Sequence, residues 1–149
     1  MRSSRVRASF AGAALAVTLV LAGCGGAAPS PRPGAVTLSA DDTSSISGHV
    51  NSDLFLAATQ GDEVTLIDVR TPEEFASGHL PGAVNIDVQS ATFAAEIAEL
   101  DREGTYALYC RSATRSRIAE SAMIADGFER VFGLDGGVSD LDPGILVTN

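Results

Sequence analysis

Cys110 lies among residues that could make its sulfur reactive. It is followed by Arg111-Ser112-Ala113-Thr114-Arg115-Ser116, which brings two guanidinium groups within five residues of the thiol. In a tight loop between a strand and a helix, successive backbone N–H groups and the positive helix end would face the sulfur and favour an anion. Such surroundings favour the thiolate, the nucleophilic form of cysteine. The residues alone leave an alternative: a small buried apolar cysteine flanked by ordinary solvated arginines.

The other cysteine, Cys24, follows a segment of a different kind. Residues 1–7 hold three arginines and no acid, and residues 8–21 carry no charge. This pattern is typical of an export signal, and the apolar run is shorter than the roughly 20 residues of a membrane-spanning helix. The run ends in Leu21-Ala22-Gly23-Cys24, which resembles the lipobox of bacterial lipoproteins. We expect residues 1–23 to be removed and Cys24 to anchor the exported protein to a membrane of the cell envelope. An ordinary signal peptide with an incidental cysteine is the alternative.

Composition and charge limit the classes of function. The 149 residues, 45% hydrophobic and 19% charged, suit one globular domain. The 19 acidic and 10 basic residues give a net charge of −9, which argues against nucleic-acid binding through a basic surface. Removing residues 1–23 would take away three arginines and make the charge −12. With two cysteines and two histidines, the spacing predicts neither a disulfide framework nor a metal site.

The composition of residues 24–50 predicts a lipidated cysteine followed by a flexible tether. The segment is rich in Gly, Ala, Ser, Pro and Thr and has no sustained apolar period. Val36 to Ser39 could add a short strand to the folded part. His49 is expected to be a solvated linker residue. The folded domain is expected to occupy residues 51–149.

From Asn51 onward, short apolar runs alternate with helix signals. Strands are expected at residues 64–69, 83–86, 105–110 and 130–132, and helices at 54–58, 72–77, 91–100 and 116–126. This alternation predicts an α/β fold with a parallel sheet and helices on both of its faces. Such sheets bind ligands at the carboxyl ends of their strands, where Cys110 is predicted to lie.

Three segments resemble the motifs of rhodanese-like domains, in the order and spacing of that family. Residues 68–86 are similar to its signature segment, residues 110–116 to its active-site loop, and residues 127–137 to its terminal segment. The resemblance spans about residues 51–141. It implies a three-layer fold with a central, mainly parallel sheet flanked by helices, and it implies a sulfurtransferase.

The resemblance also implies a mechanism. Cys110 would attack the outer sulfur of a small anionic donor such as thiosulfate, hold that sulfur as a persulfide, and pass it to cyanide or a thiol. The loop amides of Arg111, Ser112, Ala113, Thr114, Arg115 and Ser116 would stabilise the sulfur anion. The side chains of Arg111 and Arg115 would attract the donor. No cofactor, metal or general base is implied, because a thiolate formed by its surroundings is already a nucleophile.

Four other polar residues near the expected site are predicted to be structural. Asp68 and Arg70 lie at a strand end beside the expected crevice, and Arg70 and Glu74 are spaced to pair locally and hold the turn. His79 is expected to be a hydrogen-bonded structural residue, because the matching histidine of the family is not a catalytic base.

Two departures from the family pattern affect these expectations. Ala113 stands where many family loops carry glycine, so a positive φ there would add strain of about 1 kcal/mol. The tryptophan that often follows the paired glycines is absent, and Leu141 could fill its space.

Three rival functions stay open. One is a non-catalytic binding module with the same fold, and another is a persulfide or redox relay to a protein thiol. The third is a cysteine phosphatase or arsenate reductase, whose loops place arginine six residues after the cysteine, where this chain has Ser116.

Overall fold

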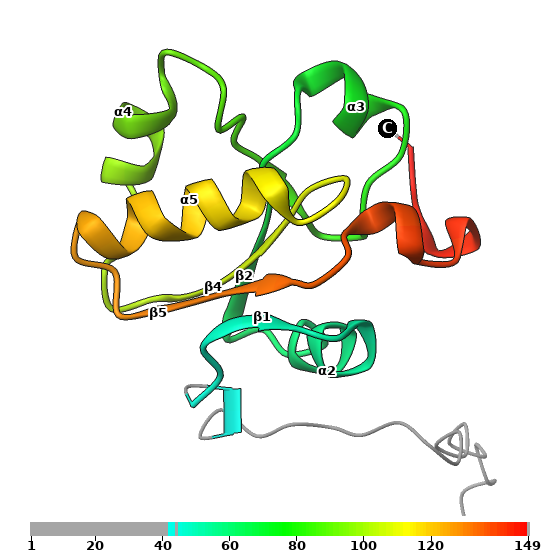
Figure 1. The fold of residues 1–149 in the computed structure, drawn as a ribbon, viewed down its shortest axis with the longest axis horizontal. Coiled ribbons are helices and arrows are strands. Elements are labelled where there is room, and N and C mark those ends of the chain that lie inside the picture. The colour runs from blue at the N-terminus through cyan, green and yellow to red at the C-terminus, as the bar shows by residue number, and fades with distance from the viewer. Residues whose placement is uncertain (1–41, 44, 149) are drawn as a thin grey trace, which may run out of the picture. The chain divides into compact units, whose positions relative to one another are not determined.

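The computed structural model describes residues 42–43 and 45–148 (Figure 1). The predicted signal peptide, Cys24, most of the predicted tether and the suggested strand at residues 36–39 lie outside the described residues. Within them, no helix is long and apolar enough to cross a membrane.

A five-stranded sheet forms the centre of the described part. Its order is β1-β5-β4-β2-β3, and every adjacent pair is parallel. The strands are β1 Gly48–Val50, β2 Val64–Asp68, β3 Val84–Asn85, β4 Thr105–Tyr109 and β5 Arg130–Leu134. The predicted parallel α/β fold is confirmed.

Helices cover both faces of this sheet (Figure 1). They are α2 Ser52–Ala58, α3 Pro72–Ala76, α4 Phe93–Ala98 and α5 Thr114–Ala125, followed by the 3-10 turns η1 Val138–Asp140 and η2 Pro143–Ile145. One core cluster joins the sheet to α4 and α5 through side chains such as Phe93, Ile97 and Met123. The other core cluster joins the opposite face to α2 through Phe55 and Ala58. The fold therefore has three layers.

Strand β4 and Cys110, the residue after it, divide their side chains between the two cores. Tyr106, Leu108 and Cys110 belong to the α4/α5 core, whereas Ala107 and Tyr109 belong to the α2 core. This alternation follows from the two-residue period of a strand. It directs the Cys110 side chain to the α5 face of the sheet.

Local signals explain where two helices begin. The side chain of Asn51 accepts a hydrogen bond from the Leu54 amide at 3.0 Å and caps α2. Thr71 caps α3 in a reciprocal capping box with Glu74, and Pro72 is the first helical residue.

The tether prediction is wrong for its last three residues. Gly48–Val50 form β1, which pairs with β5 in a register that places His49 opposite Gly133. The side chain of His49 is only 3% exposed, so it is not a solvated linker residue. A strand of three residues is too short to show the alternation by which strands are recognised in a sequence.

Candidate functional site

Cys110 lies directly after β4, at the carboxyl end of a central strand. The residue is 1% exposed and packs in the core with Val69 and Ala119, among others. It is free, and the loop that follows it leads straight into α5. Cys110 is therefore both a buried core residue and the first residue of the loop that leads to α5.

The loop reaches α5 through a left-handed residue. Ala113 has φ 64° and ψ −16° and is the one non-glycine residue with positive φ in the described part of the chain. Ala113 therefore adopts the positive φ that is costly for alanine, where the family often has glycine. The N–H groups of residues 111–116 donate no hydrogen bond to any residue that the structure describes. They are available to an anion at the sulfur.

The chain after β5 holds the loop from the other side. The Val138 amide donates to the Cys110 carbonyl at 2.9 Å, and the amide and hydroxyl of Ser139 both donate to the Arg111 carbonyl, at 3.2 and 2.8 Å. Gly137 has φ 95°, and a Cβ there would overlap the Arg111 carbonyl. Only glycine permits this close approach.

Asp68 and Arg70 form a buried ion pair beside the loop. Asp68 is fully buried and accepts hydrogen bonds from the backbone amide of Arg70 at 3.0 Å and from its guanidinium at 2.5 to 2.9 Å. The guanidinium also donates to the Gly78 carbonyl at 2.7 Å. Burial alone would lower the pKa of Arg70, but the hydrogen bond and charge of Asp68 raise it. The structural role predicted for these two residues agrees with these contacts.

The predicted local pair between Arg70 and Glu74 is wrong. Glu74 instead accepts two hydrogen bonds from Arg115, at 2.6 and 2.8 Å. The hydrogen bond from Arg115 lowers the pKa of Glu74 to about 2. Arg115 is therefore engaged, whereas the exposed guanidinium of Arg111 has no hydrogen-bond or ion-pair partner within the described residues. Of the two arginines expected to attract a donor, Arg111 is the free one.

His79 lies at the far end of α3. Its ring stacks on Phe75 at a centroid distance of 3.7 Å, and its Nδ1 forms a hydrogen bond of 2.9 Å with the Phe75 carbonyl. Its backbone forms an antiparallel bridge with Val147. His79 thus makes a hydrogen bond, as expected, and its structural role stays a prediction.

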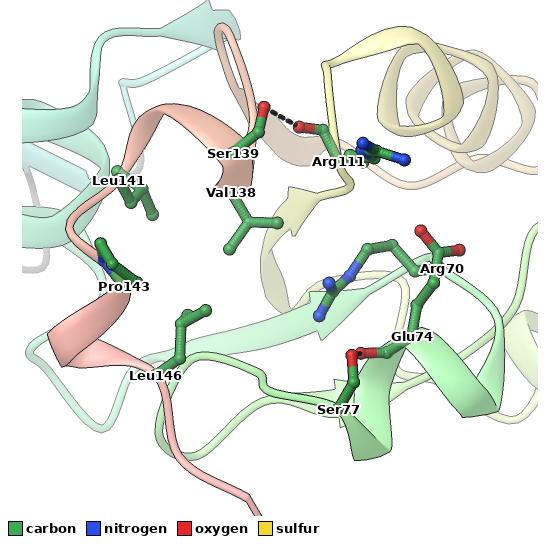
Figure 2. A pocket seen from close by; sticks show the side chains of 9 residues that line it. All are labelled: Arg70, Glu74, Ser77, Arg111, Val138, Ser139, Leu141, Pro143 and Leu146. Carbon is green, nitrogen blue, oxygen red and sulfur yellow. Dashed lines mark hydrogen bonds between the residues drawn. The ribbon is translucent and has the colours of Figure 1, made fainter.

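A cavity of about 410 Å³ opens beside the loop (Figure 2). Its lining consists of Arg70, Glu74, Ser77, Arg111, Val138, Ser139, Leu141, Pro143 and Leu146. Polar and charged side chains gather on one side, and apolar side chains from the C-terminal segment form the other (Figure 2). Leu141, which was expected to fill the space of a tryptophan, lines this cavity.

The charges around the cavity differ from those of the whole chain. Arg70, Arg111 and Arg115 oppose the carboxylates of Asp68 and Glu74, which leaves one positive charge in a protein of net charge −9. The uncompensated charge belongs to Arg111, which lines the cavity and directly follows Cys110 in the chain. A small anion near the cysteine would meet this charge first.

A second polar group lies on the side of Cys110 that faces β1 and α5. Ser116 is fully buried, and its Oγ lies 3.8 Å from the Cys110 Sγ and 3.0 Å from the Nε2 of His49. The His49 Nδ1 lies 2.9 Å from the Oε2 of Glu120. Neither His49 nor Glu120 was expected near Cys110. One signal could have revealed them: Gly133 interrupts an apolar strand, and a glycine inside a strand marks a close approach of another group.

The described residues contain no group of three or more His, Cys, Asp or Glu side chains that could hold a metal ion.

Comparison with known proteins places this fold and site in a family. Residues 52–142 match the model of the rhodanese-like domain. The chain belongs to the rhodanese-like domain family. His49, on β1, lies outside the matched residues.

The chain is similar to proteins of different kinds. The chain is 32% identical over 77 residues to a sulfurtransferase of Allochromatium vinosum, a match that covers 52% of this chain and 70% of the relative. It is 39% identical over 84 residues to the HTH-type transcriptional regulator Rv0324 of Mycobacterium tuberculosis, covering 56% of this chain but only 36% of the regulator. The chain thus spans about a third of that regulator's length.

A solved structure supports the fold. The rhodanese-like domain protein of Staphylococcus aureus superposes with a TM-score of 0.60 and 22% identity, over 70% of this chain and 99% of that one.

Proposed function

We propose that this rhodanese-like protein is a sulfurtransferase that carries sulfane sulfur as a persulfide on Cys110. The observation that supports it most is the loop after β4, where six consecutive N–H groups without a described partner surround the start of α5 next to the thiol. An anionic sulfur is the group that such a loop stabilises best. The sulfurtransferase of Allochromatium vinosum, which the chain resembles over 77 residues, supports the same class of reaction.

The proposed donor is a small anion such as thiosulfate. The Cys110 thiolate attacks the outer sulfur, a new S–S bond forms, and the donor's own S–S bond breaks so that sulfite leaves with the electron pair. An acceptor thiol or cyanide then attacks the outer sulfur of the persulfide and regenerates the Cys110 thiolate. The unpaired Arg111 would contact the anionic end of the donor. No oxidant or cofactor takes part in either transfer.

The cavity would admit the donor and the acceptor. Arg111 and Val138 line the cavity, and Cys110 is bonded to the first and accepts a hydrogen bond from the second. Because Cys110 is 1% exposed and does not itself line the cavity, attack needs a local movement that brings its sulfur to the cavity. The apolar wall of Leu141, Pro143 and Leu146 suits the carbon skeleton of a thiol acceptor.

Intact mass spectrometry after exposure to thiosulfate tests the proposal without any assumption about the acceptor. The full chain is expected to gain the mass of one sulfur atom, and peptide analysis is expected to place it on Cys110. Cys110→Ala should show no gain, and Cys24→Ser, the matched cysteine control, should gain sulfur normally. The absence of both a sulfur adduct and transfer activity in the parent protein would contradict the proposal.

A binding module is the second candidate, and one observation favours it. The nearly complete burial of the Cys110 side chain is also what a cysteine retained only for packing would show. If Cys110→Ala were indistinguishable from the parent in loading and transfer, this function would replace the enzyme. The transcriptional regulator among the relatives is a case in which the domain forms part of a larger protein.

We propose in addition that the protein is exported and anchored to a membrane by lipid on Cys24. The support is the sequence alone: three arginines, an uncharged apolar run and Leu21-Ala22-Gly23-Cys24. Residues 1–23 would be the signal peptide, and the residues between Cys24 and β1 would be the tether. Cys24→Ser is expected to move the protein from the membrane fraction to the soluble fraction, whereas unchanged fractionation would contradict the anchor.

A further inference from the structure

Four polar side chains form a continuous line that ends at the Cys110 sulfur. Glu120 on α5 contacts His49 on β1 at 2.9 Å, His49 contacts Ser116 at 3.0 Å, and Ser116 lies 3.8 Å from Cys110. These are hydrogen-bond distances for N, O and S partners. The line approaches the sulfur from the α5 side, whereas the cavity lies beside Arg111 and the C-terminal segment.

The fold makes room for this line. His49 and Gly133 face each other across β1 and β5, and a Cβ at Gly133 would overlap the imidazole ring. The side chains of His49 and Glu120 are only 3% and 12% exposed, so water cannot readily replace either partner. A buried histidine that hydrogen-bonds at both nitrogens has a fixed orientation. The arrangement therefore holds the Ser116 hydroxyl in one place relative to the sulfur.

The charges that face His49 determine its state near neutral pH. Burial, the largest effect, lowers the pKa of His49 below its ordinary value of 6.5, and the positive charge of Arg117 lowers it further. Glu120 and Asp135 act in the opposite direction. Arg117 and Asp135 also pair with each other at 2.7 Å on the surface. The imidazole is thus neutral at pH 7, with Nδ1 facing the Glu120 carboxylate and Nε2 facing Ser116, whose hydroxyl donates to the Ala113 carbonyl at 3.1 Å.

We propose that His49 is a positioning residue that accepts the Cys110 proton through Ser116, with Glu120 stabilising the resulting imidazolium. The Ser116 hydroxyl first turns from the Ala113 carbonyl to Nε2, and the thiol proton then passes to the Ser116 oxygen as the serine proton passes to Nε2. The electron pair of the broken S–H bond stays on sulfur as the thiolate. The imidazolium then donates to Ser116, and Ser116 donates to the sulfur anion, so the thiolate gains a charge-assisted hydrogen-bond chain.

This inference rests on the proposed function for the reaction that the thiolate performs, but its test does not. The rate at which iodoacetamide alkylates Cys110 is measured across pH 5 to 9 in the full chain, by mass analysis of the peptide that contains Cys110. Because alkylation follows the thiolate, the profile reports how readily the thiol loses its proton. His49→Gln keeps a polar side chain but cannot become a cation. It is expected to slow alkylation about tenfold at pH 6 and to move the rise in rate to higher pH, since one pH unit corresponds to a factor of ten.

Glu120→Gln is expected to change the profile in the same direction by a smaller factor of about three, because the hydrogen bond can persist while the charge is lost. Glu129→Gln, an exposed residue just beyond α5, is the matched control for the lost charge and should leave the profile unchanged. In a Ser116→Ala background, His49→Gln is expected to have no further effect, because the route between imidazole and sulfur is already broken.

An unchanged profile in a folded His49→Gln protein would overturn the inference, with folding checked by thermal unfolding. If His49→Gln fails to fold, Glu120→Gln provides the test. A folded Glu120→Gln protein with the alkylation profile of the parent would then overturn the inference. The inference would also be overturned if His49→Gln slowed alkylation of Cys110 equally in the parent and in the Ser116→Ala background. Persulfide loading of the parent is followed separately. If the parent forms the persulfide but His49→Gln leaves the pH profile of alkylation unchanged, this inference alone is rejected. If His49→Gln shifts the profile but the parent forms no persulfide, the proposed function alone is rejected.

Discussion

The segment from Asp68 to Gly78 and strand β1 both bring polar side chains to the loop and helix that follow Cys110, but by contacts of different range. Asp68 and Arg70 are two residues apart, and Thr71 and Glu74 complete a capping box within one turn. His49 and Ser116, by contrast, are separated by 67 residues. The first segment specifies its own shape locally, whereas the position of β1 depends on the completed sheet. The two should therefore respond differently to substitution.

The substitution with the largest expected effect lies in the segment from Asp68 to Gly78, whose contacts are local. Asp68→Ala leaves the buried Arg70 guanidinium without its carboxylate and is expected to lower the free energy of unfolding by about 3 kcal/mol, measured by denaturant titration. Asp126→Ala, which breaks the half-exposed pair with Arg102, is the matched control and should cost less than about 1 kcal/mol. Equal losses would mean that the Asp68–Arg70 pair does not hold this segment.

The long-range contact of β1 is tested at the strand that it faces. Gly133→Ala places a methyl group where the His49 ring lies and is expected to destabilise the protein by about 2 kcal/mol. Combining it with His49→Ala should recover part of that loss, so a double-mutant cycle of unfolding free energies would be non-additive. Gly61→Ala, where an added Cβ meets no atom within 4 Å, is the control. Additive losses would contradict the packing of β1 on β5.

A pH titration sharpens the comparison at Glu74, which joins the local segment to α5. Its pKa of about 2 lies below the ordinary 4.5, so the pair with Arg115 stabilises the fold fully above about pH 4.5 and loses this contribution as pH falls toward 2. Glu74→Gln is expected to cost about 1 kcal/mol at pH 7 and nothing near pH 2. Glu99→Gln, at an exposed residue outside any described ion pair, is the control and should leave the free energy of unfolding at pH 7 nearly unchanged. A pH-independent loss for Glu74→Gln would indicate packing rather than charge.

The smallest effect concerns the loop between the two regions. Ala113→Gly removes the cost of positive φ but adds freedom to the unfolded chain, so a net gain of about 0.5 kcal/mol in thermal or chemical unfolding is expected. Ala57→Gly, in the ordinary helical conformation of α2, should instead lose about 1 kcal/mol. Changes of the same sign at both positions would show that the loop conformation carries no strain.

The same difference in range explains what could be predicted from the sequence. The strands at Val64–Asp68 and Thr105–Tyr109 are long enough to be recognised, and the helix that follows Cys110 was expected at nearly its observed position. Pairing between Arg70 and Glu74 was wrongly predicted because the spacing of four residues applies within a helix, and Arg70 precedes the cap at Thr71. The prediction failed at the helix boundary.

Two features of the site depend on contacts that local patterns do not contain. Glu74 and Arg115 are 41 residues apart, and either could equally have paired elsewhere in a chain with 19 acidic and 10 basic residues. The assignment of His49 required the order of strands in the sheet, because only the adjacency of β1 and β5 brings it to Ser116. Within the described part, the glycine inside strand β5, Gly133, was the one sequence signal that another group packs closely there.

The lengths of the outermost strands have a consequence for how the protein behaves at high concentration. The sheet ends in β1, with three residues, and in β3, with two, whereas its three inner strands have five residues each. An exposed edge can recruit strands from other molecules, and a short edge offers few free N–H and C=O groups for such pairing. Without β1, the apolar strand β5 would itself become an edge. By covering β5, β1 would protect the protein from self-association.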